Sequence, residues 1–148
     1  MKKNGVVNPK LMEAITSLYH YDTIMIADLG FPVPRDCPNV IDLSLVKGIP
    51  SFTQVLKALL NECVFDEVWI DENMAKWNKP LHESLGEYLP TQTINEVPFT
   101  ELKELASKCK VIVKCGEFKP SANMILSSFS GGKASVEKYT VSFPPEFE

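Results

Sequence analysis

The stretch that decides the fold is "YHYDTIMIADLGFP", residues 19–32. Its centre, "DTIMIA", is a short apolar run with two isoleucines, a pattern typical of a strand buried on both faces. The run ends at Asp28, and the prolines of the following "GFPVPRDCP" prevent a regular element there. The stretch therefore predicts a central strand that ends in a carboxylate.

Segments on both sides of this strand predict an alternation of helices and strands. Upstream, "NPKLMEAITSLYH" has helical apolar spacing, with Asn8 as the N-cap and Pro9 in the first helical position. Downstream, strands are expected in "VIDLSL", "DEVWIDEN", "TQTINEV" and "KVIVKCGE", and helices in "GIPSFTQVLKALLNEC", "NKPLHESLGEYL" and "TELKELASKC", the last capped by Thr100. This alternation predicts an α/β fold with a largely parallel sheet.

The C-terminal part has a different pattern. "ANMILSSF" and "VEKYTVSF" both have the composition of strands, and the glycines of "SGGKAS" between them suit a turn. The two strands are expected either to form a hairpin or to pair with different neighbours.

Composition excludes several classes of function. The chain has 148 residues, 45% of them apolar, and a net charge of −4, which suits one domain, residues 1–148, with a substantial core. There is no basic block for nucleic acid and no apolar run of about 18 residues for a membrane span. Neither a signal peptide nor metal-ligand spacing among the four cysteines is evident, so we expect a cytoplasmic protein with structural thiols and no metal.

Acidic residues follow three of the predicted strands. Asp28, Asp71 with Glu72, and Glu117 stand just after strand-like runs. The carboxyl ends of parallel strands share one edge, where ligands collect, so these acids predict a polar edge suited to a sugar or polyol. The alternative is that they are solvated loop residues.

The two histidines have different prospects. His20 is expected at a helix C-terminus, where the helix dipole favours a protonated imidazole, and Asp22 is close enough in sequence to orient it. An imidazole titrates near neutral pH, as a general acid or base must, although a surface capping role is the competing interpretation. His82 lies in an amphipathic helix and is expected to be a surface residue.

Four ordered blocks give the sequence a family resemblance. "HYDTIMIADLGFPVP", "IDLSLVKGIPSFTQVL", "NKPLHESL" and "GEFKPSANMIL" resemble the D-ribose pyranases, relatives of the fucose mutarotases, over residues 3–126. The resemblance implies a three-layer α/β/α fold with a largely parallel sheet. It implies an isomerase that interconverts ring forms of a free monosaccharide by acid–base catalysis, without a cofactor. It also implies a ring-shaped homo-oligomer, often a decamer, with sites at subunit boundaries.

The resemblance also assigns site residues. His20 matches the catalytic histidine, Asp28 matches a sugar-binding aspartate, and Ser121, Ala122 and Asn123 stand where the family has Tyr-Ala-Asn. The chain departs from the family at Ser121, which replaces tyrosine. It departs at Phe99, where a second histidine is expected, and in its extension over residues 127–148. Tyr139 or Glu117 are candidates for compensating contacts. These departures leave open a fucose-type mutarotase, a non-catalytic sugar-binding homologue and an oligomeric scaffold.

Overall fold

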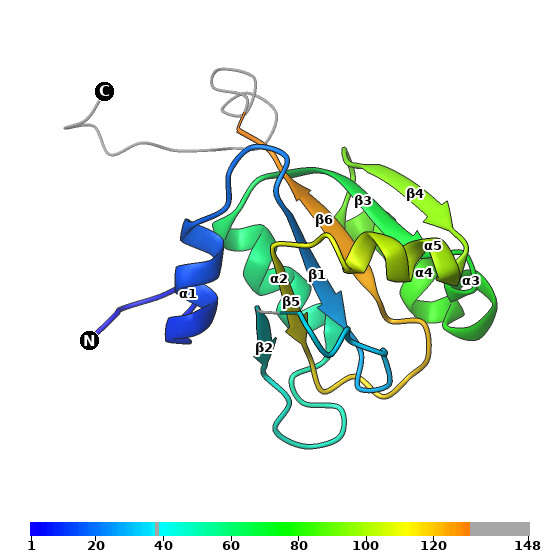
Figure 1. Ribbon diagram of the computed structural model, residues 1–148, viewed down its shortest axis with the longest axis horizontal. Helices are drawn as coiled ribbons and strands as arrows, with labels where there is room; N and C mark the ends of the chain where they lie inside the picture. Colours follow the sequence, from blue (N-terminus) through cyan, green and yellow to red (C-terminus); the bar gives the residue numbers. More distant parts are fainter. Residues whose placement is uncertain (38, 131–148) are drawn as a thin grey trace.

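A six-stranded sheet runs through the computed structural model of the chain, which describes residues 1–37 and 39–130 (Figure 1). The strands are β1 (Thr23–Ala27), β2 (Val40–Asp42), β3 (Phe65–Asp71), β4 (Thr93–Val97), β5 (Val111–Lys114) and β6 (Met124–Ser128). The helices are α1 (Pro9–Thr16), α2 (Phe52–Glu62), α3 (Met74–Trp77), α4 (Lys79–Tyr88) and α5 (Phe99–Ala106). The predicted alternation is confirmed, and the short helix α3 is an addition to it.

Strand direction in the sheet is nearly uniform. The order is β2-β5-β1-β6-β3-β4, with parallel pairing except on the two sides of β6. Strands β1 to β5 therefore point one way and β6 points the other, as the prediction of a largely parallel sheet requires. We call the side of the sheet where β1 to β5 end and β6 begins the carboxyl edge, and the opposite side the amino edge.

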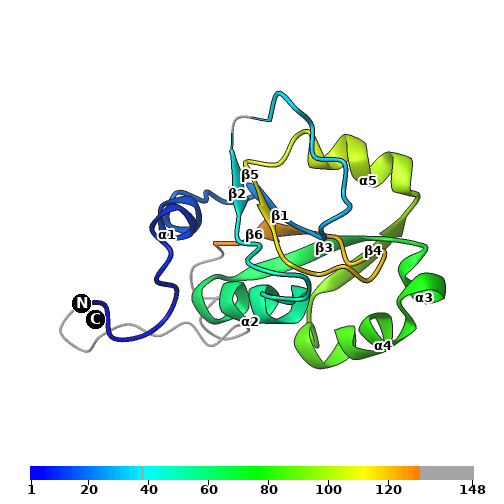
Figure 2. The ribbon, with the colours of Figure 1, turned by 90° about the horizontal axis from the view of Figure 1, so that it is seen from below.

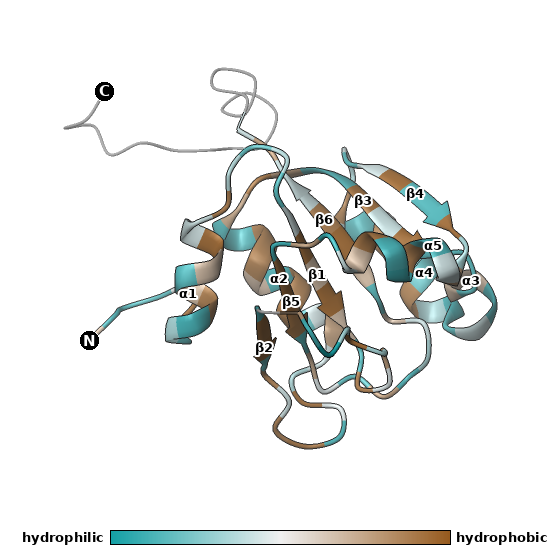
Figure 3. Cartoon of the chain, viewed as in Figure 1, coloured by the Kyte–Doolittle hydropathy of each residue, from teal (hydrophilic) through white to brown (hydrophobic). Residues whose placement is uncertain are grey.

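Strand β1 lies between two separate cores. Ile24 and Ile26 face one core, whereas Met25 and Ala27 face the other, and all four are fully buried. The first core contains apolar residues of α1, α2 and α4, and the second contains those of α5. Helices thus cover both faces (Figure 2), the central strands are among the most apolar segments (Figure 3), and the three-layer fold is confirmed.

Local sequence signals explain where the helices begin. The Asn8 side chain accepts a hydrogen bond from the Leu11 N–H at 3.0 Å. Ser51 and Gln54 form a reciprocal capping box at the start of α2. The expected Thr100 cap is wrong, because α5 begins one residue earlier, at Phe99, and Pro98 precedes it.

The position of β6 bears on the two topologies that the sequence left open for the C-terminal part. Strand β6 pairs with β1 on one side and β3 on the other, so it has no open edge for a hairpin partner. The second expected strand, "VEKYTVSF", and Tyr139 within it lie outside the described residues.

Helix α1 ends earlier than the sequence suggested. Its last residue is Thr16, with Ser17 as the C-cap, whereas His20 lies in a turn beyond them, next to Tyr21 at φ +70°. The expectation that His20 caps a helix is therefore wrong, because the dipole effect is confined to the last turn.

Candidate functional site

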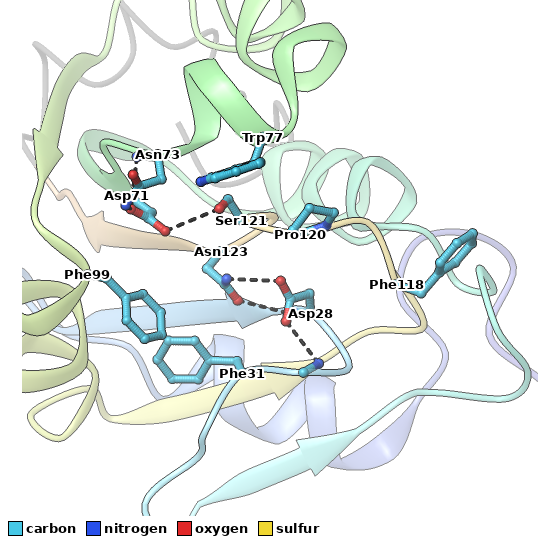
Figure 4. Close-up of a pocket in the computed structure, with 11 residues that line it drawn as sticks. Asp28, Phe31, Asp71, Asn73, Trp77, Phe99, Phe118, Pro120, Ser121 and Asn123 are labelled. Atoms are coloured by element: carbon cyan, nitrogen blue, oxygen red, sulfur yellow. Dashed lines mark hydrogen bonds between the residues drawn. The ribbon is translucent and has the colours of Figure 1, made fainter.

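A pocket of about 480 Å³ opens at the carboxyl edge, within the usual range for small-molecule sites (Figure 4). It lies over the ends of β1 and β3 and the start of β6. In the strand order, β2 lies on one side of β1, and β3 and β4 lie on the other. The strand order therefore reverses beside β1, and open α/β sheets bind ligands at such a point. Its lining residues are Asp28, Gly30, Phe31, Asp71, Asn73, Trp77, Phe99, Phe118, Pro120, Ser121 and Asn123.

Asp28 and Asn123 form a buried hydrogen-bonded pair in this pocket. The Asn123 amide donates to Asp28 Oδ2 at 3.0 Å, and its oxygen accepts from the Asp28 N–H at 2.9 Å. The Gly30 N–H donates to Asp28 Oδ1 at 3.0 Å. Burial raises the pKa of Asp28, and the hydrogen bond from Asn123 opposes that shift. The pair is fixed before any ligand arrives, with donor and acceptor capacity left for sugar hydroxyls.

A second polar group comes from the end of β3. Asp71 is buried, and its Oδ1 accepts from both the N–H and the side-chain amide of Asn73 at 2.9 Å. Its Oδ2 accepts from the Ser121 hydroxyl at 3.2 Å. Ser121 itself has φ +58°, in the left-handed region, and Asn78 donates to the Pro120 carbonyl just before it at 3.1 Å. Segments far apart in the sequence are thereby joined at one wall.

Aromatic rings supply the apolar part of the pocket. Phe31 and Phe99 meet edge to face, with centroids 5.9 Å apart, and both contribute to the core shared with α5. Trp77 and Phe118 are instead more than half exposed at the pocket. The pocket therefore combines buried hydroxyl-binding groups with aromatic faces, as sites for neutral polar ligands do.

The structure brings together most of the expected substrate-binding residues. Asp28, Phe99, Ser121 and Asn123 all line the pocket. Ala122 is buried between the last two, where its backbone supports Asp28. Glu117 lies outside the lining, in the loop after β5, so it is not placed to replace a lost sugar contact.

Several pocket residues were missed from the sequence. They are Gly30, Phe31, Asn73, Trp77, Phe118 and Pro120, and the strand-end acid Asp71 was noted only as part of the polar edge. The available signal was the sequence directly after β3, in which a second polar residue and a tryptophan follow that acid.

His20 lies at the amino edge, away from the pocket of its own chain. The whole of β1, about 16 Å at roughly 3.3 Å per residue, separates it from Asp28. Its Nδ1 accepts from the Ser130 N–H at 3.1 Å, and its ring lies 3.8 Å, centroid to centroid, from that of Tyr21. Within one chain, His20 and Asp28 therefore do not lie in the same pocket.

Asp22 fixes the turn that carries His20. Its carboxylate accepts from the Tyr19 N–H at 2.7 Å and from Lys110 Nζ at 2.9 Å. These contacts, the Tyr19 N–H first, lower the pKa of Asp22. Asp22 was expected to orient the His20 side chain, but its hydrogen bond with Tyr19 holds the backbone of the turn.

Within the described residues, nothing indicates a metal centre or a membrane span. No three metal-ligating side chains gather there, and no helix of that part is long and apolar enough to cross a bilayer. All four cysteines are free, and burial raises the pKa of Cys63, Cys109 and Cys115 to about 11, which suits unreactive structural thiols.

The fold and the pocket together define a class. Buried carboxylate and amide groups, with exposed aromatic rings at the ligand-binding edge of an α/β sheet, are the equipment of a protein that binds a small hydroxylated ligand such as a sugar. Comparison with known proteins gives the family: the chain belongs to the RbsD / FucU transport protein family, which matches residues 1–129.

Relatives named D-ribose pyranase match most of the chain. The D-ribose pyranase of Geobacillus thermodenitrificans is 41% identical over 128 residues, which is 86% of this chain and 96% of that protein. The D-ribose pyranase of Enterococcus faecalis is 34% identical over 128 residues, 86% of this chain and 97% of the other. The family resemblance inferred from the four sequence blocks is confirmed.

Solved structures agree with this family assignment. Bacillus subtilis RbsD, solved as a complex with D-ribose, is 34% identical, with a TM-score of 0.83 over 88% of this chain and 98% of that one. The fucose mutarotase of Streptococcus pneumoniae, in complex with L-fucose, has a TM-score of 0.68 over 84% of this chain and 94% of that one. At 20% identity, it shows a likeness of fold.

Proposed function

We propose that this protein is a sugar isomerase that interconverts the pyranose and furanose forms of a free, D-ribose-like monosaccharide. The observation that carries the proposal is the buried Asp28–Asn123 pair, preformed in a sugar-sized pocket at the carboxyl edge. Relatives named D-ribose pyranase, and a structural neighbour solved with D-ribose, support this substrate class.

The reaction breaks one C–O bond and forms another, and its catalysis requires only proton transfers. The anomeric hydroxyl loses a proton while the ring oxygen gains one, the ring opens, and another hydroxyl then adds to the carbonyl. General acid–base catalysis of this kind contributes about 10²–10⁴-fold. In our proposal His20 transfers the protons, whereas Asp28 and Asn123 hold sugar hydroxyls and orient the ring.

This division of roles leads us to propose a site shared between two copies of the chain. His20 of one copy would reach the pocket of the next, since one chain keeps them at opposite edges of the sheet. Large apolar side chains are exposed on both surfaces. Tyr19 and Tyr21 flank His20, whereas Leu45 and Ile49 belong to the loop before α2, whose Lys47 lies over the ring of the pocket residue Phe118. Contacts between two different surfaces form a ring when the rotation between copies closes, in keeping with the ring-shaped oligomer, often a decamer, that the family resemblance implies.

The test is saturation-transfer NMR on D-ribose, L-fucose and other free sugars. We expect wild type to accelerate exchange between ring forms, and His20→Ala to lose about 10²-fold or more. His82→Ala is the matched control, because His82 lies on the surface and contacts Glu96 at 2.5 Å. Equal exchange rates for wild type and His20→Ala would refute the assignment.

A second candidate is a sugar-binding homologue without catalysis. It is favoured by Ser121 and Phe99, which stand where the family resemblance implies a tyrosine and a second histidine. This candidate predicts that a sugar raises the melting temperature although no exchange is accelerated. Finding both stabilisation and acceleration would reject it.

We also propose a cytoplasmic location. The four free thiols suit a reducing compartment, and a free monosaccharide is a metabolic substrate there. Fractionation of cells that express the chain, with thiol trapping, tests this part of the proposal.

A further inference from the structure

One wall of the pocket has no role in the function proposed above. It consists of Asp71, Ser121 and Trp77, which we call the β3 wall because Asp71 ends β3 and Trp77 ends α3 just after it. Figure 4 shows these residues on one side of the Asn123–Asp28 pair, and Phe31 and Phe99 on the other. We propose that the β3 wall is a second recognition element, which binds a sugar hydroxyl different from those held by Asp28 and Asn123. This inference rests on the proposed function.

Asp71 is built as a fixed acceptor. Only 4% of its surface is exposed, and both donors of Asn73 hold its Oδ1 at 2.9 Å. Its Oδ2 accepts the Ser121 hydroxyl at 3.2 Å. A carboxylate oxygen accepts two hydrogen bonds, so Oδ2 can also take one from a ligand hydroxyl.

Ser121 is held where its hydroxyl serves the pocket. At φ +58° its backbone is in a region that costs a non-glycine residue free energy, and such positions are concentrated at ligand sites. Its Oγ–H is directed to Asp71, which leaves the oxygen lone pairs for a sugar hydroxyl. Together, the two residues present a pair of acceptors on one side of the ligand.

Trp77 adds an apolar face beside these acceptors. The indole remains 58% exposed although it is one of the largest apolar side chains. An aromatic ring beside hydroxyl acceptors can contact the C–H face of a sugar while the acceptors bind its hydroxyls. Among the residues that line the pocket, the ionisable side chains are Asp28 and Asp71. The β3 wall therefore suits a neutral sugar and disfavours sugar phosphates and sugar acids by charge repulsion.

The experiment is a cycle of paired deletions in the protein and in the ligand. Dissociation constants of D-ribose and its 2-deoxy and 3-deoxy analogues are measured by NMR titration for wild type, Ser121→Ala and Asn123→Ala. A contact between a residue and a hydroxyl makes the two deletions non-additive. We expect Ser121→Ala to weaken D-ribose binding about fivefold to tenfold, as the loss of one hydrogen bond predicts.

The pattern across the analogues identifies the hydroxyl. We expect one deoxy analogue whose penalty in wild type disappears in Ser121→Ala, and a different one whose penalty disappears in Asn123→Ala. Trp77→Ala should weaken all the sugars about fivefold to tenfold, and Trp77→Phe should restore most of the loss. Ser84→Ala, which removes a hydroxyl bonded to the Leu81 carbonyl outside the pocket, serves as the matched control.

The outcomes separate this inference from the function on which it rests. Wild type that neither binds nor exchanges any sugar would overturn both. Wild type that exchanges ribose, with unchanged dissociation constants in Ser121→Ala and Trp77→Ala, would overturn the β3 wall alone. The same hydroxyl coupled to both Ser121 and Asn123 would also overturn it, because the wall would then recognise nothing separately.

Discussion

The two edges of the sheet differ in how their functional residues are held. At the carboxyl edge, Asp28, Asp71 and Asn123 are buried and joined to their neighbours by several hydrogen bonds. At the amino edge, His20 stands on an exposed turn, which is fixed mainly through Asp22. The residues proposed to recognise the sugar are therefore preorganised within one chain, whereas the proposed proton-transfer group is presented outward.

This contrast suggests why the two tasks are separated. Buried acceptors can be prepared in advance, because the surrounding core holds them rigidly and removes competing water. In the proposed shared site, a second copy of the chain completes the environment of the exposed His20. The predictions below test this separation, from the largest expected effect to the smallest.

The sharpest test mixes two inactive variants. His20→Ala lacks the proton-transfer group and should lose at least about 10²-fold in exchange rate. Asp28→Asn lacks the buried carboxylate that orients the ring, and a misplaced sugar should cost a factor of about 10². If each site takes its two halves from different copies, random co-assembly restores about a quarter of the sites. The measurement is NMR exchange after the two variants are unfolded together and refolded.

The control for mixing is refolding of each variant separately before they are combined. Activity that stays at the level of the single variants in fully mixed oligomers would show that both residues act within one chain. That outcome would remove the proposal of a shared site.

The second prediction concerns stability at the two edges. Asn123→Ala removes the side chain that pairs with the Asp28 N–H and with Asp28 Oδ2, and we expect it to lower the free energy of unfolding by about 2–4 kcal/mol. His20→Ala should change it by less than about 0.5 kcal/mol in the dissociated chain, as exposed positions do. Urea denaturation measures both, with the exposed Asn39→Ala as an asparagine control. Equal losses of unfolding free energy in Asn123→Ala and His20→Ala would contradict the difference between the two edges.

A third prediction uses the raised pKa of Asp28. Burial raises this pKa above 3.8, so the stability it contributes is complete below about pH 3.8 and is lost as pH rises through the raised value. Relative to Asp28→Asn, wild type should therefore become less stable between about pH 4 and pH 7. Calorimetry should show the melting-temperature difference growing by on the order of a few degrees. A melting-temperature difference that does not change with pH would mean that burial does not raise the pKa of Asp28.

The smallest effect is expected at Asp22, with the opposite sign. Hydrogen bonds from the Tyr19 N–H and from Lys110 lower the pKa of Asp22, so its contribution is present above about pH 3.8 and is lost as pH falls through the lowered value. Asp22→Asn should cost at most about 1 kcal/mol at neutral pH, because the ion pair is partly exposed. That cost should shrink in acid, whereas the exposed Asp36→Asn should cost little at any pH.

Much of the carboxyl edge was predictable from the sequence. Strand β1 was evident from its apolar run, and a carboxylate after a parallel strand must lie at the carboxyl edge. Asp28 and Asp71 could therefore be assigned to one edge without coordinates. Trp77 could not, since the short helix α3 that carries it has too few residues for a helical period to be recognised.

The position of His20 was not predictable in the same way. Continuous helical spacing up to Tyr19 suggested that α1 reaches His20, but the helix ends at Thr16 and a turn with Tyr21 at positive φ follows. The local spacing predicted the longer helix, whereas the turn that follows Thr16 is held by contacts with Lys110 and with the end of β6.

By itself, the sequence determined the class of fold, the family and the residues of the buried acceptor pair. The class of fold follows from hydrophobic periodicity. The family and the roles of Asp28 and Asn123 follow from the resemblance that four sequence blocks carry. Only the tertiary structure decided that β6 enters the sheet between β1 and β3, which brings Asn123 to Asp28 and Ser121 to Asp71. It also decided that His20 and the pocket lie at opposite edges. The physical reason is that strand order and long-range pairing depend on how two cores close around the sheet, and no local pattern encodes that choice.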